Sequence, residues 1–273
     1  MDEIVRVLVL GVVQGLTEFI PVSSSGHLIL VPALFKWPDQ GLAFDVGLHA
    51  GTLLAVLAYF RRDWFRMLGS VLADARKRTG VSEFAADTRL FAMLVVASVP
   101  VAIVGLLLHD WIEENTREPW IVAITLIMFG GTLLAADRMV ERRTDSATLP
   151  WAQAVFVGLA QTFALMPGVS RAGASISAAR ATGLSRQESA RFAFLLGTPA
   201  IAGGTLLTFS DFLDSSSQEV DELAVGFVTS AVVGWVAVAF LMRFLQSRSY
   251  APFVFYRWGV AALTLAIAGL RVA

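Results

Sequence analysis

Two apolar segments of this chain repeat each other at a fixed offset of 147 residues, and neither can form an unbroken membrane-spanning helix. Residues 11–27 read GVVQGLTEFIPVSSSGH, and residues 158–173 read GLAQTFALMPGVSRAG. The matched pairs are Gly11 and Gly158, Gln14 and Gln161, Val22 and Val169, Ser23 and Ser170, and Gly26 and Gly173. Proline and glycine interrupt both segments, and each carries an ionisable residue. Broken apolar segments at corresponding positions of two halves predict a binding site near the middle of a bilayer.

The composition is that of an integral membrane protein. Of 273 residues, 56% are hydrophobic and 16% are charged, and the mean hydropathy is +0.68. A formal net charge of -1 gives no basic field for nucleic acid. The chain has no cysteine, which excludes thiol catalysis, disulfides and thiolate metal sites. The first residues lack a basic region and a cleavage pattern, so we expect them to belong to the mature fold.

Six further segments are long and apolar enough to be expected as membrane spans. A span needs about 20 mostly apolar residues to cross roughly 30 Å of hydrocarbon. The six segments are 44–60, 90–108, 120–136, 190–209, 222–241 and 252–270. The two interrupted regions, 3–36 and 151–186, are expected to form helix–break–helix hairpins that enter the membrane and return. Irregular backbone at that depth must be surrounded by protein or a cavity, so we expect the hairpins inside a ring of spans.

The charges of the loops predict an inverted repeat. The 61–89 connection carries seven Lys or Arg residues, whereas 210–222 carries five acids and no base. Because basic loops stay in the cytoplasm, both termini are expected outside and the two hairpins enter from opposite sides. We therefore expect one all-α membrane domain over 1–273. Its first repeat, 1–143, has one re-entrant hairpin and three transmembrane helices, and its second, 144–273, repeats this unit inverted.

Arg171 is the most informative single residue. A charge at the centre of a membrane helix costs about 2.5–3.5 kcal/mol on insertion scales, so something must offset it. Arg171 follows a proline–glycine turn and precedes an expected helix start, where free amide hydrogens attract anions. Its planar guanidinium is suited to phosphate. The alternative is an arginine that pairs with one structural acid or reaches the membrane surface. We expect the surrounding small and hydroxyl residues to help bind substrate: Gly168, Ser170, Gly173 and Ser175.

Glu18 lies at the corresponding depth of the first hairpin. It follows Gln14 by one helical turn, so the two side chains share a helix face. A carboxylate there can bind a hard divalent cation or transfer a proton. The alternative is a structural partner that only neutralises Arg171. We expect Glu18 to be catalytic and Gln14 to contact substrate.

A serine run and a histidine follow the first break. Ser23, Ser24 and Ser25 offer donors for phosphate oxygens or one nucleophile, and His27 falls near them on the next helical turn. Serines are also ordinary helix caps, and His27 could bond to a core carbonyl. We expect Ser24 and His27 to be catalytic and the other two serines to bind substrate. For His49, a position near the site and a satisfied histidine at a helix end are equally good explanations.

These motifs resemble the signature regions of the undecaprenyl-pyrophosphate phosphatases, the bacitracin-resistance family. The resemblance rests on QGLTEFIPVSSSGH from residue 14, PGVSRAGAS from residue 167 and FDVGLHAGTLLAV from residue 44. It implies a multi-pass hydrolase of the bacterial inner membrane that removes the terminal phosphate of undecaprenyl pyrophosphate. That reaction recycles the lipid carrier for peptidoglycan synthesis, supports cell shape and confers bacitracin resistance. The resemblance also implies a need for Mg²⁺ or Ca²⁺ and the fold of six spans plus two re-entrant hairpins.

The resemblance assigns roles residue by residue. The family's glutamate-rich motif falls on Gln14 and Glu18, its serine and histidine on Ser24 and His27, and its phosphate-binding serine and arginine on Ser170 and Arg171. Three departures are present: Gln14 where Glu is common, Ala172 where Ser is usual, and Ser175 where Thr is usual. The first departure weakens a metal site built on two carboxylates and leaves Glu18 as the expected ligand.

The sequence leaves several alternatives open. The nucleophile is Ser24, His27 or a water molecule. A transporter that returns the lipid phosphate across the membrane would use the same anion site, because inverted repeats with broken helices are typical of alternating access. A purely structural membrane subunit is a third reading. The oligomeric state is undetermined, with a homodimer among the options.

Overall fold

All ordered secondary structure in the described part of the chain is helical. The structure is a computed structural model, and it describes residues 3–38, 42–78, 80–139, 145–207 and 217–272. The helices are α1 (Glu3–Phe19), α2 (Ser24–Phe35), α3 (Leu42–Tyr59), α4 (Arg61–Lys77), α5 (Ala86–Thr116), α6 (Pro119–Asp137), α7 (Trp151–Thr162), α8 (Arg171–Ala181), α9 (Arg186–Leu207), α11 (Ser217–Phe244) and α12 (Ala251–Val272). Short 3₁₀ turns occupy Val81–Glu83, Ser146–Thr148 and Phe163–Leu165.

Within the described residues, four helices are long and apolar enough to cross a membrane. They contain Ala86–Leu108, Pro119–Asp137, Val220–Phe244 and Ala251–Ala268. These stretches correspond to four of the six expected spans, and they make the chain a multi-pass membrane protein.

The other two expected spans, 44–60 and 190–209, lie in α3 and α9 where the structure describes them. The apolar part of α3, Phe44–Tyr59, is shorter than 18 residues. Helix α9 begins with charged residues that pair inside the protein, and much of its surface is buried. A membrane helix that its neighbours enclose does not need a fully apolar surface, so hydropathy alone does not identify such a helix as a span.

Each of the two interrupted regions forms a helix, a break and a second helix, and the residues that follow the two breaks have similar backbone geometry. Chain direction changes between α1 and α2 and again between α7 and α8. Ser23 (φ 78°) and Ser170 (φ 74°) cap the returning helices, and both have the positive φ that non-glycine residues rarely adopt. Each cap accepts from the amide three residues on: Gly26 N to Ser23 Oγ is 3.3 Å, and Gly173 N to Ser170 Oγ is 3.1 Å. The repeat seen in the sequence is therefore a repeat of backbone structure at these caps.

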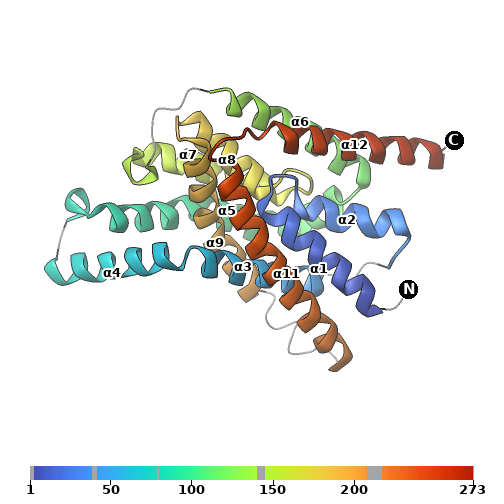
Figure 1. The fold of residues 1–273 in the computed structure, drawn as a ribbon, viewed down its shortest axis with the longest axis horizontal. Coiled ribbons are helices and arrows are strands. Elements are labelled where there is room, and N and C mark those ends of the chain that lie inside the picture. Colours follow the sequence, from blue (N-terminus) through green and yellow to red (C-terminus); the bar gives the residue numbers. More distant parts are fainter. Residues whose placement is uncertain (1–2, 39–41, 79, 140–144, 208–216, 273) are drawn as a thin grey trace.

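The helices of the two halves pack against each other reciprocally. Helix α1 lies along α11 of the second half, and α7 of the second half lies along α5 of the first (Figure 1). Helices α3 and α9 also pack together, as do α6 and α12. Glycine permits close approach in both cross-half pairs. A Cβ on Gly158 would lie 2.1 Å from the Ala97 carbonyl oxygen, and one on Gly11 would lie 3.1 Å from the Gly226 carbonyl oxygen.

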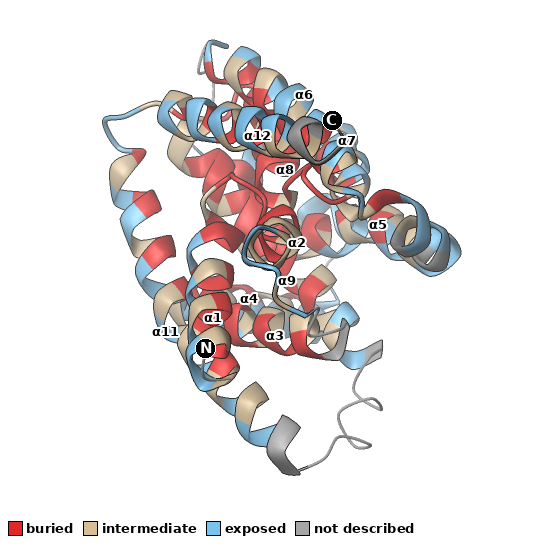
Figure 2. Cartoon of the chain, turned by 90° about the vertical axis from the view of Figure 1, so that its right-hand side faces the viewer, coloured by how far each residue is buried: buried red, intermediate tan, exposed pale blue. Residues whose placement is uncertain are grey.

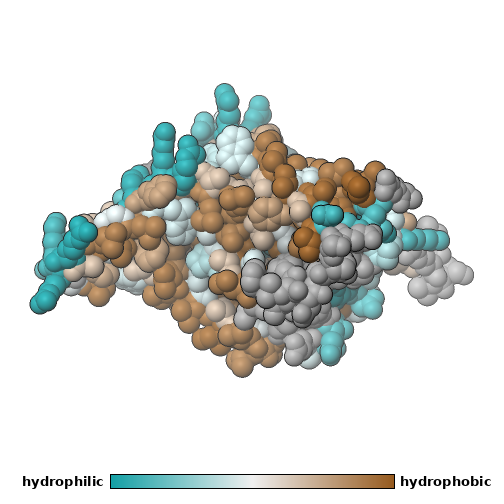
Figure 3. Space-filling model, turned by 90° about the horizontal axis from the view of Figure 1, so that it is seen from below, coloured by the Kyte–Doolittle hydropathy of each residue, from teal (hydrophilic) through white to brown (hydrophobic). Residues whose placement is uncertain are grey.

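The two breaks are buried, but α1 and α7 each expose large apolar side chains, such as Ile4 and Leu159, so the expected ring of spans does not fully enclose the hairpins. In Figure 2 the buried residues concentrate on α8, α9 and the inner faces of α1 and α3. Large exposed apolar side chains such as Leu107, Val232 and Leu263 lie on α5, α11 and α12. Figure 3 shows apolar side chains over the middle of one face, with hydrophilic side chains at its left-hand end and along its upper edge. Lipid is the solvent that suits such a surface.

Candidate active site

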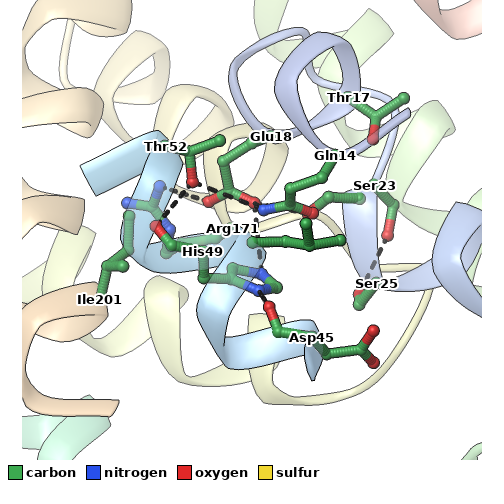
Figure 4. A network of polar contacts seen from close by, with 12 residues as sticks. Gln14, Thr17, Glu18, Ser23, Ser25, Asp45, His49, Thr52, Arg171 and Ile201 are labelled. Carbon is green, nitrogen blue, oxygen red and sulfur yellow. Dashed lines mark hydrogen bonds and ion pairs between the residues drawn. The ribbon is translucent and has the colours of Figure 1, made fainter. Parts of the chain in front are cut away.

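Glu18 is the centre of a buried polar network that joins the two hairpins. It lies in the last turn of α1 and is 5% exposed. Its Oε1 accepts a hydrogen bond from Arg171 Nη2 at 2.8 Å, and its Oε2 accepts one from Ser24 Oγ at 2.5 Å (Figure 4). Gln14 Nε2 donates to the same Oε2 at 3.2 Å. Four predicted site residues from both halves of the chain therefore meet at one carboxylate.

The positions of these side chains follow from the local structure. Gln14 and Glu18 are one turn apart on α1, so they present their side chains to the same side. Ser24 and Arg171 are the first residues of α2 and α8. The first amide hydrogens of a helix have no acceptor within the helix and carry partial positive charge. Two helix starts and one guanidinium thus converge near Glu18, an arrangement that favours an anion.

Arg171 keeps one free donor in this network. Its Nη1 is buried and has no hydrogen-bond partner, while Nη2 is paired with Glu18. The guanidinium lies against α9 at Gly197, where an added Cβ would fall only 0.9 Å from Nη1. Glycine at this position leaves the room that the arginine occupies. A phosphate oxygen could satisfy the free donor.

Helix α3 contributes two residues that were not among the predicted site residues. His49 Nε2 lies 3.5 Å from Glu18 Oε2, and Thr52 Oγ1 lies 3.5 Å from Gln14 Nε2. His49 Nδ1 is 2.7 Å from the Asp45 carbonyl oxygen, which can only accept, so Nδ1 carries the hydrogen. Of the two explanations open for His49, the structure gives a position at the Glu18 network. In the sequence, the signal for this position was that His49 lies three residues before Thr52, in the segment FDVGLHAGTLLAV that resembles the family.

His27 is held by a different set of contacts from Ser24. Its Nδ1 donates to the Ser23 carbonyl oxygen at 2.7 Å, so Nε2 accepts from the Tyr256 hydroxyl at 2.9 Å. The His27 and Tyr256 rings also stack, with centroids 5.6 Å apart. The Ser24 hydroxyl instead donates to Glu18. In this arrangement the carboxylate, rather than the imidazole, is positioned to take the proton of Ser24.

The remaining predicted binding residues surround the two breaks. Ser25 Oγ is 3.4 Å from Ser23 Oγ in the first hairpin. In the second, Gly168 has φ 87° and lies so close to α6 that a Cβ would meet Thr125 Oγ1 at 2.0 Å. Ser175 is fully buried one turn into α8, and its hydroxyl has no partner.

Arg257 is a buried charge at this site that the sequence reasoning missed. It lies on α12 with no exposed surface, and it donates to carbonyl oxygens of both breaks. The signal was present, because an arginine inside the expected span 252–270 is as costly as Arg171. Arg257 has no matching residue in the repeated segments, so the comparison of the two halves did not select it.

The donor set fits a divalent cation that arrives with phosphate, and it does not fit one held by protein alone. The described residues contain no group of three or more His, Asp or Glu side chains that could hold a metal ion. Glu18 is the carboxylate of this network, and the buried Gln14 Oε1 is an oxygen without a partner. Mg²⁺ commonly takes one or two carboxylates and completes its shell with water and substrate phosphates. Glu18 and Gln14 are the residues that would hold such an ion.

Comparisons with known proteins agree with the motifs. The family model described as "Bacitracin resistance protein BacA" matches residues 7–263. Three relatives named "Undecaprenyl-diphosphatase" cover nearly the whole chain. That of Pelotomaculum thermopropionicum is 42% identical over 265 residues, which is 96% of this chain and 97% of the relative. That of Alcanivorax borkumensis is 43% identical over 94% of this chain and 97% of the relative. That of a Nocardioides species is 39% identical over 100% of this chain and 99% of the relative.

Proposed function

This chain belongs to the bacitracin resistance protein BacA family, and we propose that it is a membrane undecaprenyl-diphosphatase. It hydrolyses undecaprenyl pyrophosphate to undecaprenyl phosphate and inorganic phosphate, recycling the lipid carrier for cell-wall synthesis and conferring resistance to bacitracin. The support is the relatives' name at about 42% identity over nearly the whole chain, together with the apolar helices.

The contact between Glu18, Ser24 and Arg171 is the observation that carries this proposal. It places the Ser24 hydroxyl 2.5 Å from one oxygen of the Glu18 carboxylate and the Arg171 guanidinium 2.8 Å from the other, and these groups come from two separate hairpins. Phosphoryl transfer depends mainly on positioning the reacting groups and stabilising charge on the phosphate oxygens. A nucleophile with its base and a cationic clamp are the groups this reaction requires.

In the proposed reaction Ser24 is the nucleophile. Its Oγ attacks the terminal phosphorus while Glu18 takes the hydroxyl proton, and the bridging oxygen leaves with undecaprenyl phosphate. Water then attacks the seryl phosphate, releasing inorganic phosphate and returning the proton to Ser24. Arg171, Ser170 and the free amides of the two helix starts hold the diphosphate. A divalent cation bound with the substrate would neutralise part of the phosphate charge.

The fine architecture is part of the proposal. We place six spans and two re-entrant hairpins in one domain, with 144–273 inverted relative to 1–143. Matching serine caps and reciprocal helix packing support this arrangement. The protein would lie in the bacterial inner membrane with both termini outside, and it could form a homodimer there.

The test is phosphate release by the purified protein in detergent. Wild type should release inorganic phosphate from undecaprenyl pyrophosphate with Mg²⁺, and Glu18→Gln and Arg171→Ala should not. A labelled substrate would also identify the nucleophile: acid-stable label points to Ser24, acid-labile label to His27, and no label to direct attack by water.

The reciprocal packing of the two halves also suits a transporter of the lipid phosphate. Hydrolysis needs no second compartment, so detergent separates the two functions. If wild type binds the lipid yet releases no phosphate, the hydrolase proposal fails and transport is favoured.

A further inference from the structure

Arg257 is a positive charge buried in an apolar helix, and its hydrogen bonds go to backbone carbonyls. It lies in the candidate span Ala251–Ala268 and has 0% exposure. A buried guanidinium is tolerated only when its donors are satisfied, and an ion pair is the usual way. The hydrogen bonds of Arg257 instead go to oxygens of Pro21, Thr125, Leu126, Gly168 and Val169.

These carbonyls belong to three separate parts of the chain. Pro21 lies in the break of the first hairpin, 3.3 Å from Nη1. Gly168 and Val169 lie in the break of the second hairpin, 2.9 and 3.1 Å from Nη2. Thr125 and Leu126 belong to α6. One side chain therefore connects both broken segments to each other and to a spanning helix.

The bond to Val169 also sets the direction of a donor in the proposed phosphate site. In a trans peptide the C=O and N–H groups point in opposite directions. Because the Val169 carbonyl points at Arg257, the N–H of Ser170 in the same peptide points away from it. Ser170 precedes Arg171, whose free Nη1 lies in the Glu18 network. The guanidinium also withdraws charge through the carbonyl, which makes that N–H a better donor.

We propose that Arg257 is a positioning residue for the diphosphate, and this inference rests on the proposed function. It fixes the two breaks relative to each other so that Ser24, from one hairpin, and Arg171, from the other, both reach Glu18. It does not touch substrate itself, because it is fully buried and its hydrogen bonds go to backbone carbonyls. Lysine cannot replace it, since an ammonium group lacks the planar fork that reaches several carbonyls at once.

The rival explanation is that Arg257 only stabilises the fold. Arg180 separates the two explanations because it is a similar residue at the far end of α8. It is 1% exposed and donates to carbonyl oxygens of Leu184, Asp137 and Met139. Loss of either arginine should lower stability, but only loss of Arg257 should disturb the breaks.

The experiment compares Arg257→Lys and Arg257→Gln with Arg180→Lys and Arg180→Gln. Each protein is purified in detergent, and its folded fraction is measured by gel filtration and thermal unfolding. Per folded molecule, we measure kcat and KM for undecaprenyl pyrophosphate and inhibition by inorganic pyrophosphate. The Arg257 variants should lose about tenfold or more in kcat/KM and bind pyrophosphate more weakly, because small misplacements of reacting groups are costly. The Arg180 variants should keep both values within about threefold of wild type.

Two outcomes overturn the inference while leaving the proposed function intact: an active Arg257→Lys protein with wild-type kcat/KM, or equal losses in the Arg180 variants. If the Arg257 variants do not fold, Thr125→Val tests whether the position of the second break affects substrate binding. Thr125 Oγ1 donates to the Pro167 carbonyl of that break at 2.7 Å. A raised KM in that folded variant supports the positioning of the break, and an unchanged KM overturns it. An inactive wild type would instead count against the proposed function.

Discussion

At the scale of single residues, the two oxygens of Glu18 have separate tasks. Oε1 accepts from Arg171, and Oε2 accepts from Ser24. The pair with Arg171 joins the hairpins, and the bond to Ser24 supplies a base for the proposed nucleophile. The two readings left open from the sequence, a structural partner and a catalytic group, are therefore compatible in one side chain.

Glu18→Gln tests the second task. Glutamine keeps the size of the side chain and can still contact Ser24, but it cannot accept a proton. We expect phosphate release to fall by about 10²- to 10⁴-fold, the usual contribution of a general base. The measurement is the initial rate of the purified protein, with Glu114→Gln, an exposed acid on α5, as the control. Activity within a few-fold of wild type would show that no base is needed at this position.

Gly197→Ala tests the space that Arg171 occupies. The methyl group would fall 0.9 Å from the present position of Nη1, so the guanidinium must move away from Glu18. We expect KM to rise and kcat/KM to fall by about 10- to 100-fold, because the clamp on the diphosphate is misplaced. Gly203→Ala on the same helix is the matched control, since nothing lies within 4 Å of its added Cβ. Equal effects of the two substitutions would contradict the assignment.

The residues that the sequence identified were those with two independent signals. Arg171 was both a charge in an apolar segment and part of a repeated motif. Arg257 had only the first signal, and its carbonyl partners lie 88 to 236 residues away in the sequence, which no local pattern reveals. His49 was ambiguous because a histidine in a helix can bond to the carbonyl one turn earlier whether or not it serves a site, and His49 does so here with Asp45.

At the scale of helices and turns, the breaks carry most of the function. Pro21 and the Pro167–Gly168 pair follow the preceding helical segments, because proline lacks the amide hydrogen of a helical hydrogen bond and disfavours helix in the residue before it. The sequence therefore predicted where the breaks lie. It could not predict the positive φ of Ser23 and Ser170, since serine seldom adopts this conformation and only tertiary contacts enforce it.

A pair of substitutions at Ser170 tests this backbone geometry. Ser170→Ala loses the cap and keeps a Cβ at positive φ, whereas Ser170→Gly loses the cap but removes the strain. Loss of a serine cap to alanine costs about 1 kcal/mol, and to glycine a few tenths. Thermal unfolding in detergent should therefore rank wild type first, Ser170→Gly second and Ser170→Ala last. If alanine is tolerated better than glycine, the φ of 74° is not that of the folded protein in solution.

At the scale of the whole molecule, the inverted arrangement is a prediction on which two independent sequence signals agree. The loop charges predict the side of the membrane on which each loop lies. The repeat predicts which segments of the two halves correspond. What could not be predicted was that α1 would lie along α11 and α7 along α5, so that each hairpin is supported by the other half. Such cross-half packing depends on shape, including the close approach at Gly158.

The absence of cysteine makes the proposed topology directly testable. Single cysteines can be placed at exposed positions expected outside, Glu114→Cys, and inside, Ser82→Cys in the first half and Ser247→Cys in the second. Because basic loops stay in the cytoplasm, a membrane-impermeant maleimide should label position 114 in intact cells and the other two only after permeabilisation. Phosphate release by each variant is the control for correct folding. Labelling of position 247 but not position 82 in intact cells would place the two basic connections on opposite sides. The second half would then not be the inverted copy of the first, and the two hairpins could not enter from opposite faces to meet at Glu18.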